Sequence, residues 1–271
     1  MLTSEDPVIV GKGLDKFINY QIDRPKKRYA RIAENYYRSE HDILNARLIV
    51  EDEHGGLIDA GINYQIPHSF FFVQIDQKVQ YLLANGVQVE VDNDLPYKDE
   101  LEEELKEYFD DDFNLAIDEI VEGASIKGAE YMYARTTAQD ELKFEASDML
   151  TTDTVFNDLR EEVAVVRHYQ ETVADGKKEI RLRYAEVYTD DQVSYFIKDE
   201  GSKNNRGYAL NQNVQPNPRP HVVAKSLKDD EKLLSRSYGR IPFFRMANNR
   251  LEESDLKPVK HLIDDYDRIA S

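Results

Sequence analysis

The sequence predicts an α+β protein in which helices pack against an antiparallel sheet. Through residues 11–122, apolar side chains recur at three- and four-residue spacing, as they do on the buried face of a helix. Between residues 129 and 198 the period changes to two, which is the alternation of half-buried strands. Hydrophobic residues make up 41% of the 271 positions, so a chain of this length can bury a sizeable core.

The first helical stretch runs from Gly11 to Glu40, and Pro25 begins its second segment. Its apolar positions are Leu14, Phe17, Ile18, Tyr29, Ile32, Ala33 and Tyr36. The second segment also carries a basic run inside an acidic protein, formed by Arg24, Lys26, Lys27, Arg28 and Arg31. Such a run is either a solvated helix face or a surface that contacts DNA or an acidic neighbouring protein.

A helix and a short strand are expected next. Ser69 is a suitable N-cap for a helix that runs to about Asn85. The apolar stripe of this helix is Phe72, Ile75, Val79 and Leu82. Valines then alternate with polar residues from Gly86 to Val91, which predicts a short strand.

The most acidic part of the chain lies between Asp92 and Glu122. It holds 14 acidic residues and two lysines, and so contributes −12 of the net charge of −18. Pro96 opens an amphipathic helix here, and a second helix follows the Asp110–Asp112 break; the apolar positions of the two are Leu101, Leu105, Tyr108, Phe113, Ile117 and Ile120. We expect both helices to pack against the body, because an apolar stripe must be buried somewhere.

An acidic face accompanies these two helices. Its carboxylates include Glu102, Glu103, Glu107, Asp110, Asp111 and Asp112. This face is either solvated, or it repels a polyanion or docks a basic partner.

The region of period two contains several strand runs joined by short turns. The Asp175–Gly176 pair stands between two of these runs and is a good hairpin signal. A loop rich in Asn, Pro and Gly spans residues 201–220, and Ile241–Phe244 is a candidate for a short buried strand.

The last segment, residues 254–271, predicts a helix capped by Ser254. Its apolar positions are expected on one face, at Leu256, Val259, Leu262, Ile263 and Tyr266. No Gly or Pro stop signal ends this helix. We therefore expect that the chain ends in mid-helix and is a truncated form of a longer protein.

No catalytic or metal-binding motif is present in the sequence. Cysteine is absent, which excludes disulfides, thiolate metal sites and cysteine nucleophiles. No two of the six histidines are spaced i,i+4 on one helix, and zincin, P-loop, dinucleotide-binding and nucleophile-elbow motifs are absent. Consecutive carboxylates such as Asp110–Asp112 do not converge like metal ligands, and we expect a structural role for His41. We therefore expect neither enzyme activity nor a cofactor.

Charge and hydropathy also limit the partners. A net charge of −18 argues against broad affinity for DNA phosphates, which needs a surface of Lys and Arg. The longest strongly apolar run, Phe70–Val73, is far shorter than the roughly 20 residues that span a bilayer. No signal peptide is evident. We expect a protein of the cytoplasm or of a capsid, with no membrane partner.

Four stretches form an ordered set along the chain. They are YYRSEHDI at residues 36–43, IPHSF at 66–70 followed by DQKVQYLL at 76–83, GASIKGAEY at 123–131, and GRIPFF at 239–244 followed by the segment 254–267. In order and spacing, this set resembles the portal (head–tail connector) proteins of tailed phages, in the subgroup typical of phages of Gram-positive hosts. The resemblance covers nearly the whole chain.

The resemblance implies a structural subunit of a ring, usually of twelve subunits, at the unique vertex of the capsid. Such a ring forms the channel for genome packaging and ejection and connects head to tail. Residues 1–253 resemble the wing domain, and residues 254–271 resemble the start of a stem helix. The clip, the rest of the stem and the crown would lie beyond Ser271.

The resemblance also implies partners: further copies of the chain, the terminase large subunit, the major capsid protein, the scaffolding protein and a head-completion protein. Double-stranded DNA would pass through the channel, and the protein would be made in the bacterial cytoplasm and reside in the virion. Because contacts in a closed ring are head-to-tail, we expect the acidic helices 92–122 and the basic face 24–31 to help neighbouring subunits pair.

Two other readings start from the acidic residues alone. One is an acidic adaptor or DNA-mimic module that binds a basic partner protein. The other is a metal-dependent nuclease, which the absence of a suitable motif disfavours. Neither accounts for the ordered set of motifs.

Overall fold

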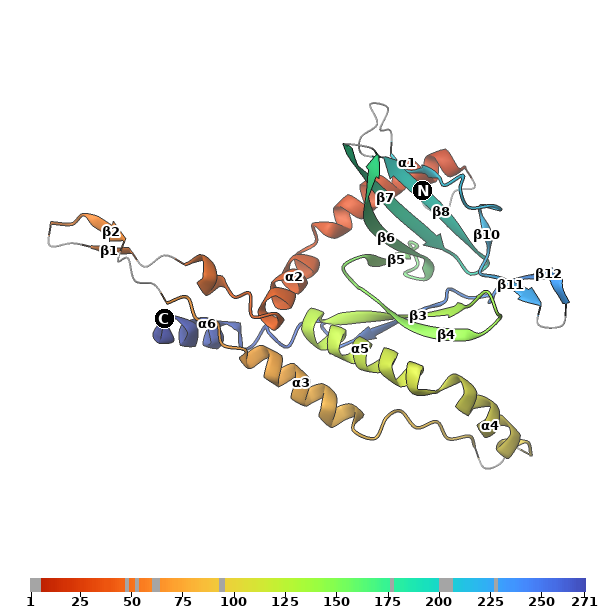
Figure 1. Cartoon of the computed structure of the whole chain (residues 1–271), viewed down its shortest axis with the longest axis horizontal. Helices are drawn as coiled ribbons and strands as arrows, with labels where there is room; N and C mark the ends of the chain where they lie inside the picture. The colour runs from red at the N-terminus through yellow and green to blue at the C-terminus, as the bar shows by residue number, and fades with distance from the viewer. Residues whose placement is uncertain are drawn as a thin grey trace.

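The computed structural model describes residues 6–46, 49–51, 54–59, 64–92, 96–175, 178–199, 207–226 and 229–271. The N-terminal half is helical: α1 (Pro7–Ile22), α2 (Pro25–Tyr37), the 3-10 turn η1 (Asp42–Asn45), α3 (Phe70–Leu83), α4 (Lys98–Tyr108) and α5 (Asp111–Lys127), with a small hairpin of β1 (Ile49–Glu51) and β2 (Leu57–Asp59). The C-terminal half is mostly strands, and a final helix, α6 (Lys260–Ala270), ends the chain (Figure 1). The expected α+β class is confirmed.

The strands form two main antiparallel sheets. The larger has the order β10-β8-β7-β6-β5, with β9 also paired to β8; its bounds are β5 (Thr152–Phe156), β6 (Glu162–Asp175), β7 (Lys178–Tyr188), β8 (Gln192–Asp199), β9 (Ala209–Leu210) and β10 (Arg219–Pro220). The smaller has the order β13-β3-β4, from β3 (Ala129–Thr136), β4 (Leu142–Ser147) and β13 (Phe243–Ala247). A separate hairpin pairs β11 (Val222–Ser226) with β12 (Asp229–Arg236).

The strand region 129–198 therefore belongs to two sheets. The chain leaves the smaller sheet after β4 and enters the larger one at β5. The hairpin predicted from Asp175–Gly176 is confirmed by the register of β6 and β7, in which Asp175 pairs with Lys178; Gly176 itself lies outside the described residues. Within the expected loop 201–220, the described part contains the short strands β9 and β10.

Three hydrophobic clusters hold these layers together. In the first, Val10, Leu14 and Ile18 of α1 pack on the larger sheet, which contributes Ala164, Val166, Ala185, Val187 and Phe196. Gly11 allows this close approach, because a Cβ at this position would lie 1.9 Å from the carbonyl oxygen of Tyr208. The α1 face predicted at Leu14 and Ile18 is thus buried as expected.

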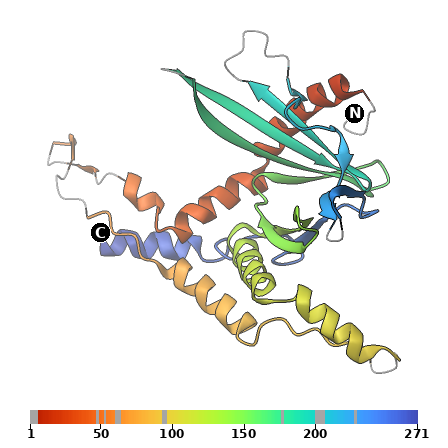
Figure 2. The ribbon, with the colours of Figure 1, turned by 45° about the vertical axis from the view of Figure 1, so that its right-hand side comes forward.

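The second cluster lies between the two sheets, and the third lies among the helices. Helix α2 contributes to both, because its residues Ala30, Ala33 and Tyr36 are buried at three-residue spacing. Ala30 packs with residues of β3, β6 and β8, whereas Ala33 and Tyr36 pack with α3, α5 and α6. Helices α1 and α2 therefore join the sheets to the other helices, as the two views in Figures 1 and 2 show.

The turn from α5 into the smaller sheet depends on Gly128. This residue follows the last turn of α5 with φ at +99°, in the left-handed region where glycine carries no steric penalty. A Cβ here would also lie 2.4 Å from the carbonyl oxygen of Glu252. The stretch 123–131 thus ends a helix and starts a strand.

Two expectations for residues 69–91 were wrong in detail. The strand predicted at residues 86–91 is absent from the described structure: these residues lie in neither a helix nor a strand. Gly86 adopts a φ of +64°, the backbone N–H of Val87 donates to the side chain of Asn114, and no described strand pairs with this segment. In α3, the buried residues are Phe71 and Ile75, while Phe72 and Leu82 are about half-exposed.

Candidate functional site

The basic run does not form one continuous surface. Lys27 is buried, because α2 begins at Pro25 and its inward stripe starts two residues later. Its Nζ donates to Oδ2 of Asp153 at 2.7 Å and to the carbonyl oxygen of Leu150 at 3.0 Å. Burial lowers the pKa of Lys27, although Asp153 opposes this shift. Lys27 is therefore an internal ion-pair residue and is not available to a partner.

The other members of the run point in different directions. Arg24, Lys26 and Arg28 are exposed, and Arg31 is half-buried. Arg31 donates to the carbonyl oxygen of Ile22 at 3.0 Å, so it stabilises the junction between α1 and α2. Arg28 lies 3.9 Å from Asp23 on the solvent side. Only Arg24 and Lys26, with the buried Lys27, line a common pocket.

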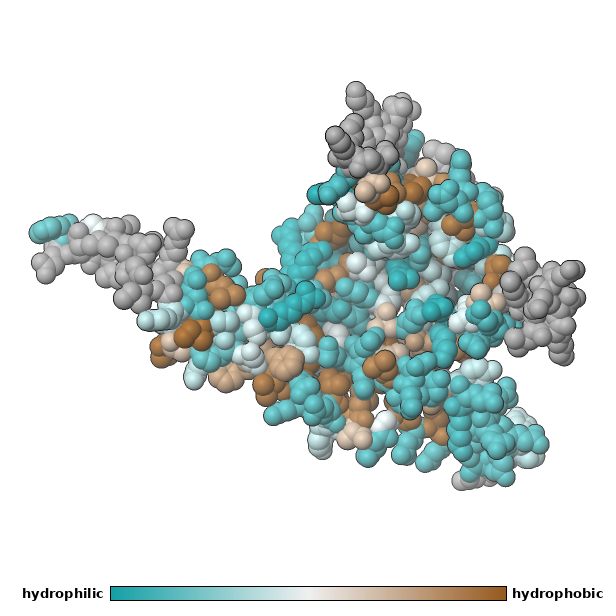
Figure 3. Space-filling view, viewed as in Figure 1, coloured by the Kyte–Doolittle hydropathy of each residue, from teal (hydrophilic) through white to brown (hydrophobic). Residues whose placement is uncertain are grey.

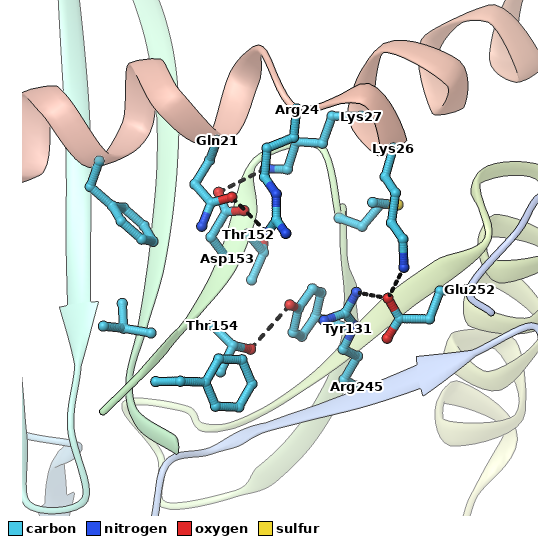
Figure 4. Close-up of a pocket in the computed structure, with 14 residues that line it drawn as sticks. Gln21, Arg24, Lys26, Lys27, Tyr131, Thr152, Asp153, Thr154, Arg245 and Glu252 are labelled. Atoms are coloured by element: carbon cyan, nitrogen blue, oxygen red, sulfur yellow. Dashed lines mark hydrogen bonds and ion pairs between the residues drawn. The ribbon is translucent and has the colours of Figure 1, made fainter. Parts of the chain in front are cut away.

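This pocket, which we call the basic pocket, has a volume of about 480 Å³. It lies where the α1–α2 junction crosses over β3, β5 and β13 (Figure 4). Its cationic side chains are Arg24, Lys26, Lys27 and Arg245, and its carboxylates are Asp153 and Glu252. Four cations against two carboxylates leave two positive charges in excess, within a chain whose net charge is −18.

Glu252 is the carboxylate at one side of the basic pocket. Its Oε2 accepts from Nζ of Lys26 at 2.9 Å and from Nη2 of Arg245 at 2.8 Å. Burial opposes ionisation, but the Lys26 hydrogen bond and the positive charges of Arg245 and Arg24 hold the pKa of Glu252 below its ordinary value. Glu252 is thus a carboxylate shared between two cations.

Arg24 has a neutral partner instead. Its Nη1 donates to the side-chain amide oxygen of Gln21 at 3.1 Å, and no carboxylate within the described residues forms an ion pair with it. Arg245 also lies over the ring of Tyr131, 5.6 Å from the centroid, and Tyr131 in turn contacts Thr154 at 3.1 Å. Arg245 was not identified from the sequence; it stands alone on β13, 221 positions after Arg24, and no local pattern marks it.

The acidic helices differ in how they are held. Helix α5 buries Phe113, Ile117 and Ile120 and packs against β3 and β4. In α4, by contrast, no residue is fully buried, so the expected packing against the body is only partial. Its stripe of Leu101 and Leu105 is partly buried, and the helix projects beyond the smaller sheet (Figures 1 and 2). We call residues 96–112 the acidic arm.

The predicted acidic residues therefore have different environments. Asp110 caps α5: its Oδ1 accepts from the backbone N–H of Phe113 at 2.9 Å, and this hydrogen bond lowers the pKa of Asp110. Asp112 pairs with Lys143 at 2.9 Å. Glu102 lies 3.5 Å from Lys98 on the same helix. The exposed members of the predicted set are Glu103, Glu107, Asp111 and Asp112.

The last helix begins later than expected and turns a different face inward. Residues 255–259 form turns, and α6 starts at Lys260. Pro258 disfavours helix at the residue before it, and Ser254 is buried, where its Oγ accepts from the backbone N–H of Leu256.

The buried face of this segment is narrow. Leu256 and Ile263 are buried, and Val259 packs on them. Leu262 and Tyr266, which were assigned to the same face, are 69% and 50% exposed. With Ile269, 86% exposed, they form an apolar stripe at i, i+4 and i+7 on the outer side of α6.

A polar cluster that the sequence did not reveal fixes α6 to the N-terminal helices. Asp267 is fully buried; it accepts from Nδ1 of His41 at 2.6 Å and from Nδ1 and the backbone N–H of His68 at 2.9 and 3.0 Å. Lys260 donates to Asp42, Asp264 and the hydroxyl of Tyr36. The structural role expected for His41 agrees with this geometry; its partner lies 226 positions away, beyond the reach of any local pattern.

Exposed apolar side chains continue from α6 onto α3. Tyr266 packs edge-on against Phe70, with ring centroids 5.0 Å apart. Phe70, Val73 and Tyr81 are exposed at i, i+3 and i+11 along α3. In Figure 3 hydrophobic surface lies along α3, whereas hydrophilic surface covers α4.

Within the described residues, no three His, Asp or Glu side chains are placed so that they could hold a metal ion. In the same part of the chain, no helix is both long and apolar enough to cross a membrane.

Comparison with known proteins assigns the family. The portal protein of Bacillus phage SPP1 is 32% identical over 243 residues, an alignment that covers 87% of this chain and 44% of the relative. The portal protein of Clostridium phage phiCD119 is 23% identical over 265 residues, covering 88% of this chain and 50% of the relative. The chain thus spans about half the length of these curated relatives. The family described as phage portal protein, SPP1 Gp6-like, matches residues 15–271, and the chain belongs to this family.

Proposed function

We propose that this chain provides part of a structural subunit of a phage portal ring, located at the unique vertex of the capsid. The observation that carries the proposal is the family match over residues 15–271, which leaves out only the first 14 residues. The ring would form the channel for genome packaging and ejection and connect head to tail. In this reading the protein is a virion component with a mechanical role and is not an enzyme.

The distribution of surface properties supports a subunit of an assembly. Leu262, Tyr266, Phe70 and Val73 form an apolar stripe that is exposed to water, where it does not stabilise a monomer. Exposed apolar patches of this kind mark interaction sites. The body that carries the stripe is well packed, so the exposure does not come from a loose fold. We propose that residues 1–253 belong to a wing domain and that residues 254–271, which include α6, are the start of a stem helix held to the wing by Asp267.

The acidic surface fits passage of DNA. Proteins bind DNA non-specifically when Lys and Arg neutralise phosphates and release counterions. A subunit with a net charge of −18 avoids such trapping over most of its surface. The partners proposed for the complete subunit are further copies of itself, the terminase large subunit, the major capsid protein, the scaffolding protein and a head-completion protein.

The proposal is tested by mass measurement. Light scattering is applied to this chain and to a fusion in which Ser271 is followed by the part of the Bacillus phage SPP1 relative beyond the matched region. We expect the fusion to form closed rings visible by electron microscopy, and this chain alone to form smaller species. A fusion that folds but stays monomeric at all salt concentrations would contradict the ring function and would favour the acidic adaptor.

A further inference from the structure

The basic pocket contains positive charge that its own residues do not neutralise. Lys27 and Asp153 form a closed buried pair, with side chains only 5% and 7% exposed. Lys26 and Arg245 share the single carboxylate of Glu252. Arg24 bonds a neutral amide. Counted over its lining residues, the pocket therefore carries two more cations than carboxylates, in a protein that is otherwise strongly acidic.

The acidic arm has an excess of negative charge and is only partly covered by its own subunit. Helix α4 has 11 residues, and no residue in it is buried. Isolated helices shorter than about 12–15 residues are marginal in water, so α4 gains little stability from its own backbone. Its exposed carboxylates include Glu100, Glu103, Glu104 and Glu107. These positions fall on one stripe of the helix, about a quarter to a third of a turn away from Leu101 and Leu105.

The arm cannot fill the pocket of its own subunit. In both ribbon views, α4 lies at the far end of the molecule from the α1–α2 junction that borders the pocket (Figures 1 and 2). Two complementary surfaces at different places on one chain favour a head-to-tail contact between copies. Such contacts form a ring when the rotation from one copy to the next closes after a whole number of copies.

We propose that the acidic arm of one subunit docks in the basic pocket of a second copy of this chain. This inference rests on the proposed ring function and names one contact that builds the ring. Carboxylates of the Glu100–Glu107 stripe pair with Arg24, Lys26 and Arg245, while Leu101 and Leu105 lie on the apolar wall formed by Phe17, Val155 and Phe156. Phe156, which lines the pocket, is 55% exposed in the single chain, as expected for an apolar side chain that is covered only when a partner binds.

Charge-exchange variants test the contact in the whole chain. The pocket variant is Arg24→Glu with Lys26→Glu, and the arm variant is Glu103→Lys with Glu107→Lys. Arg28→Glu and Asp118→Lys are the controls, because both positions are exposed and lie outside the pocket and the arm. Circular dichroism confirms that each variant is folded before association is measured.

Sedimentation velocity at low salt gives the first result. We expect the wild-type chain to associate with increasing concentration, and 0.5 M salt to weaken this association by the screening of charges, as a contact between charged surfaces requires. The pocket variant and the arm variant alone should each associate at least about 10-fold more weakly, whereas both controls should behave as wild type. In a 1:1 mixture of the two variants, the intact arm of the pocket variant fits the intact pocket of the arm variant, and the exchanged arm fits the exchanged pocket, so association should recover.

The combined variant, with both pairs exchanged in one chain, should recover association to within about threefold of wild type. Failure of this recovery, a wild-type chain that stays monomeric at low salt, or variants that associate as wild type would each overturn the docking. The fusion described above separates the two proposals. If the wild-type fusion forms rings and the pocket-variant fusion forms them in equal yield, the docking is wrong and the ring function stands. If the wild-type fusion forms no rings, the ring function itself fails.

Discussion

Nδ1 of His41 lies 2.6 Å from Oδ2 of Asp267, and this hydrogen bond joins the end of the first helical pair to the last helix of the chain. Both side chains are fully enclosed. The other oxygen of Asp267 accepts two hydrogen bonds from His68. A single carboxylate thus connects three segments that are far apart in the sequence, and it sets the direction in which α6 leaves the body.

Replacing this carboxylate by an amide should therefore be costly. We expect Asp267→Asn to lower the free energy of unfolding by about 2–5 kcal/mol, because an amide NH₂ would face the donors of His41 or His68 inside the protein. Asp265→Asn is the control, since its side chain is 67% exposed, and it should change stability by less than about 0.5 kcal/mol. Urea denaturation measures both. Equal stability of the two variants would contradict the role assigned to Asp267.

The face that α6 turns inward gives a second prediction, which separates the expected stripe from the observed one. Ile263 is 5% exposed in the helical core, while its neighbour Leu262 is 69% exposed. Ile263→Ala should cost about 2–5 kcal/mol by loss of buried area and the cavity left behind. Leu262→Ala should cost less than about 0.5 kcal/mol in this chain. A larger loss of stability for Leu262→Ala than for Ile263→Ala would show that the helix is rotated by one residue from this arrangement.

Local patterns predicted the elements well and their environments less well. The period change near residue 129 and the hairpin at Asp175 depend on neighbouring residues and were found where expected, while the break expected at Asp110–Asp112 lies at residues 109–110. Which residues of α4 or α6 are buried depends on what lies beside the helix. The apolar spacing of α4 is that of a packed helix, but Leu101 and Leu105 are only partly buried and no residue of this helix is fully buried.

The candidate surfaces also depend on contacts that local sequence patterns do not predict. The basic run was visible in the sequence, but the burial of Lys27 depends on Asp153, 126 positions away. Arg245 and Glu252 come from the last strand and the turn after it, and no single-sequence pattern connects them with Arg24. The family resemblance was recognisable because it depends on ordered short motifs, which do not require knowledge of these contacts.

Adjacent lysines of the basic run provide the third prediction. Lys27→Met should lower the free energy of unfolding by about 3–5 kcal/mol, because Asp153 would keep its charge in a buried site without its main partner. Lys26→Met should cost less than about 1 kcal/mol, since Lys26 is 53% exposed and Arg245 still pairs with Glu252. Adding Asp153→Leu to Lys27→Met should recover most of the loss. Thermal and urea unfolding measure all three variants; similar losses for the two lysines would contradict the buried pair.

The pH dependence of stability gives the fourth prediction, at the buried Glu130. Burial raises the pKa of Glu130 from 4.5 to about 7, against the opposing effect of Lys127 and of the hydrogen bond from the backbone N–H of Met149. Between pH 4.5 and about pH 7, the folded protein binds a proton that the unfolded chain has released, so the free energy of unfolding falls as pH rises. The contribution is complete below pH 4.5 and is lost as pH rises through about 7. Glu130→Gln should flatten this part of the profile by up to about 3 kcal/mol relative to wild type. Urea unfolding at pH 5, 6, 7 and 8 measures the difference, and parallel profiles for wild type and Glu130→Gln would show that Glu130 is ionised throughout this range.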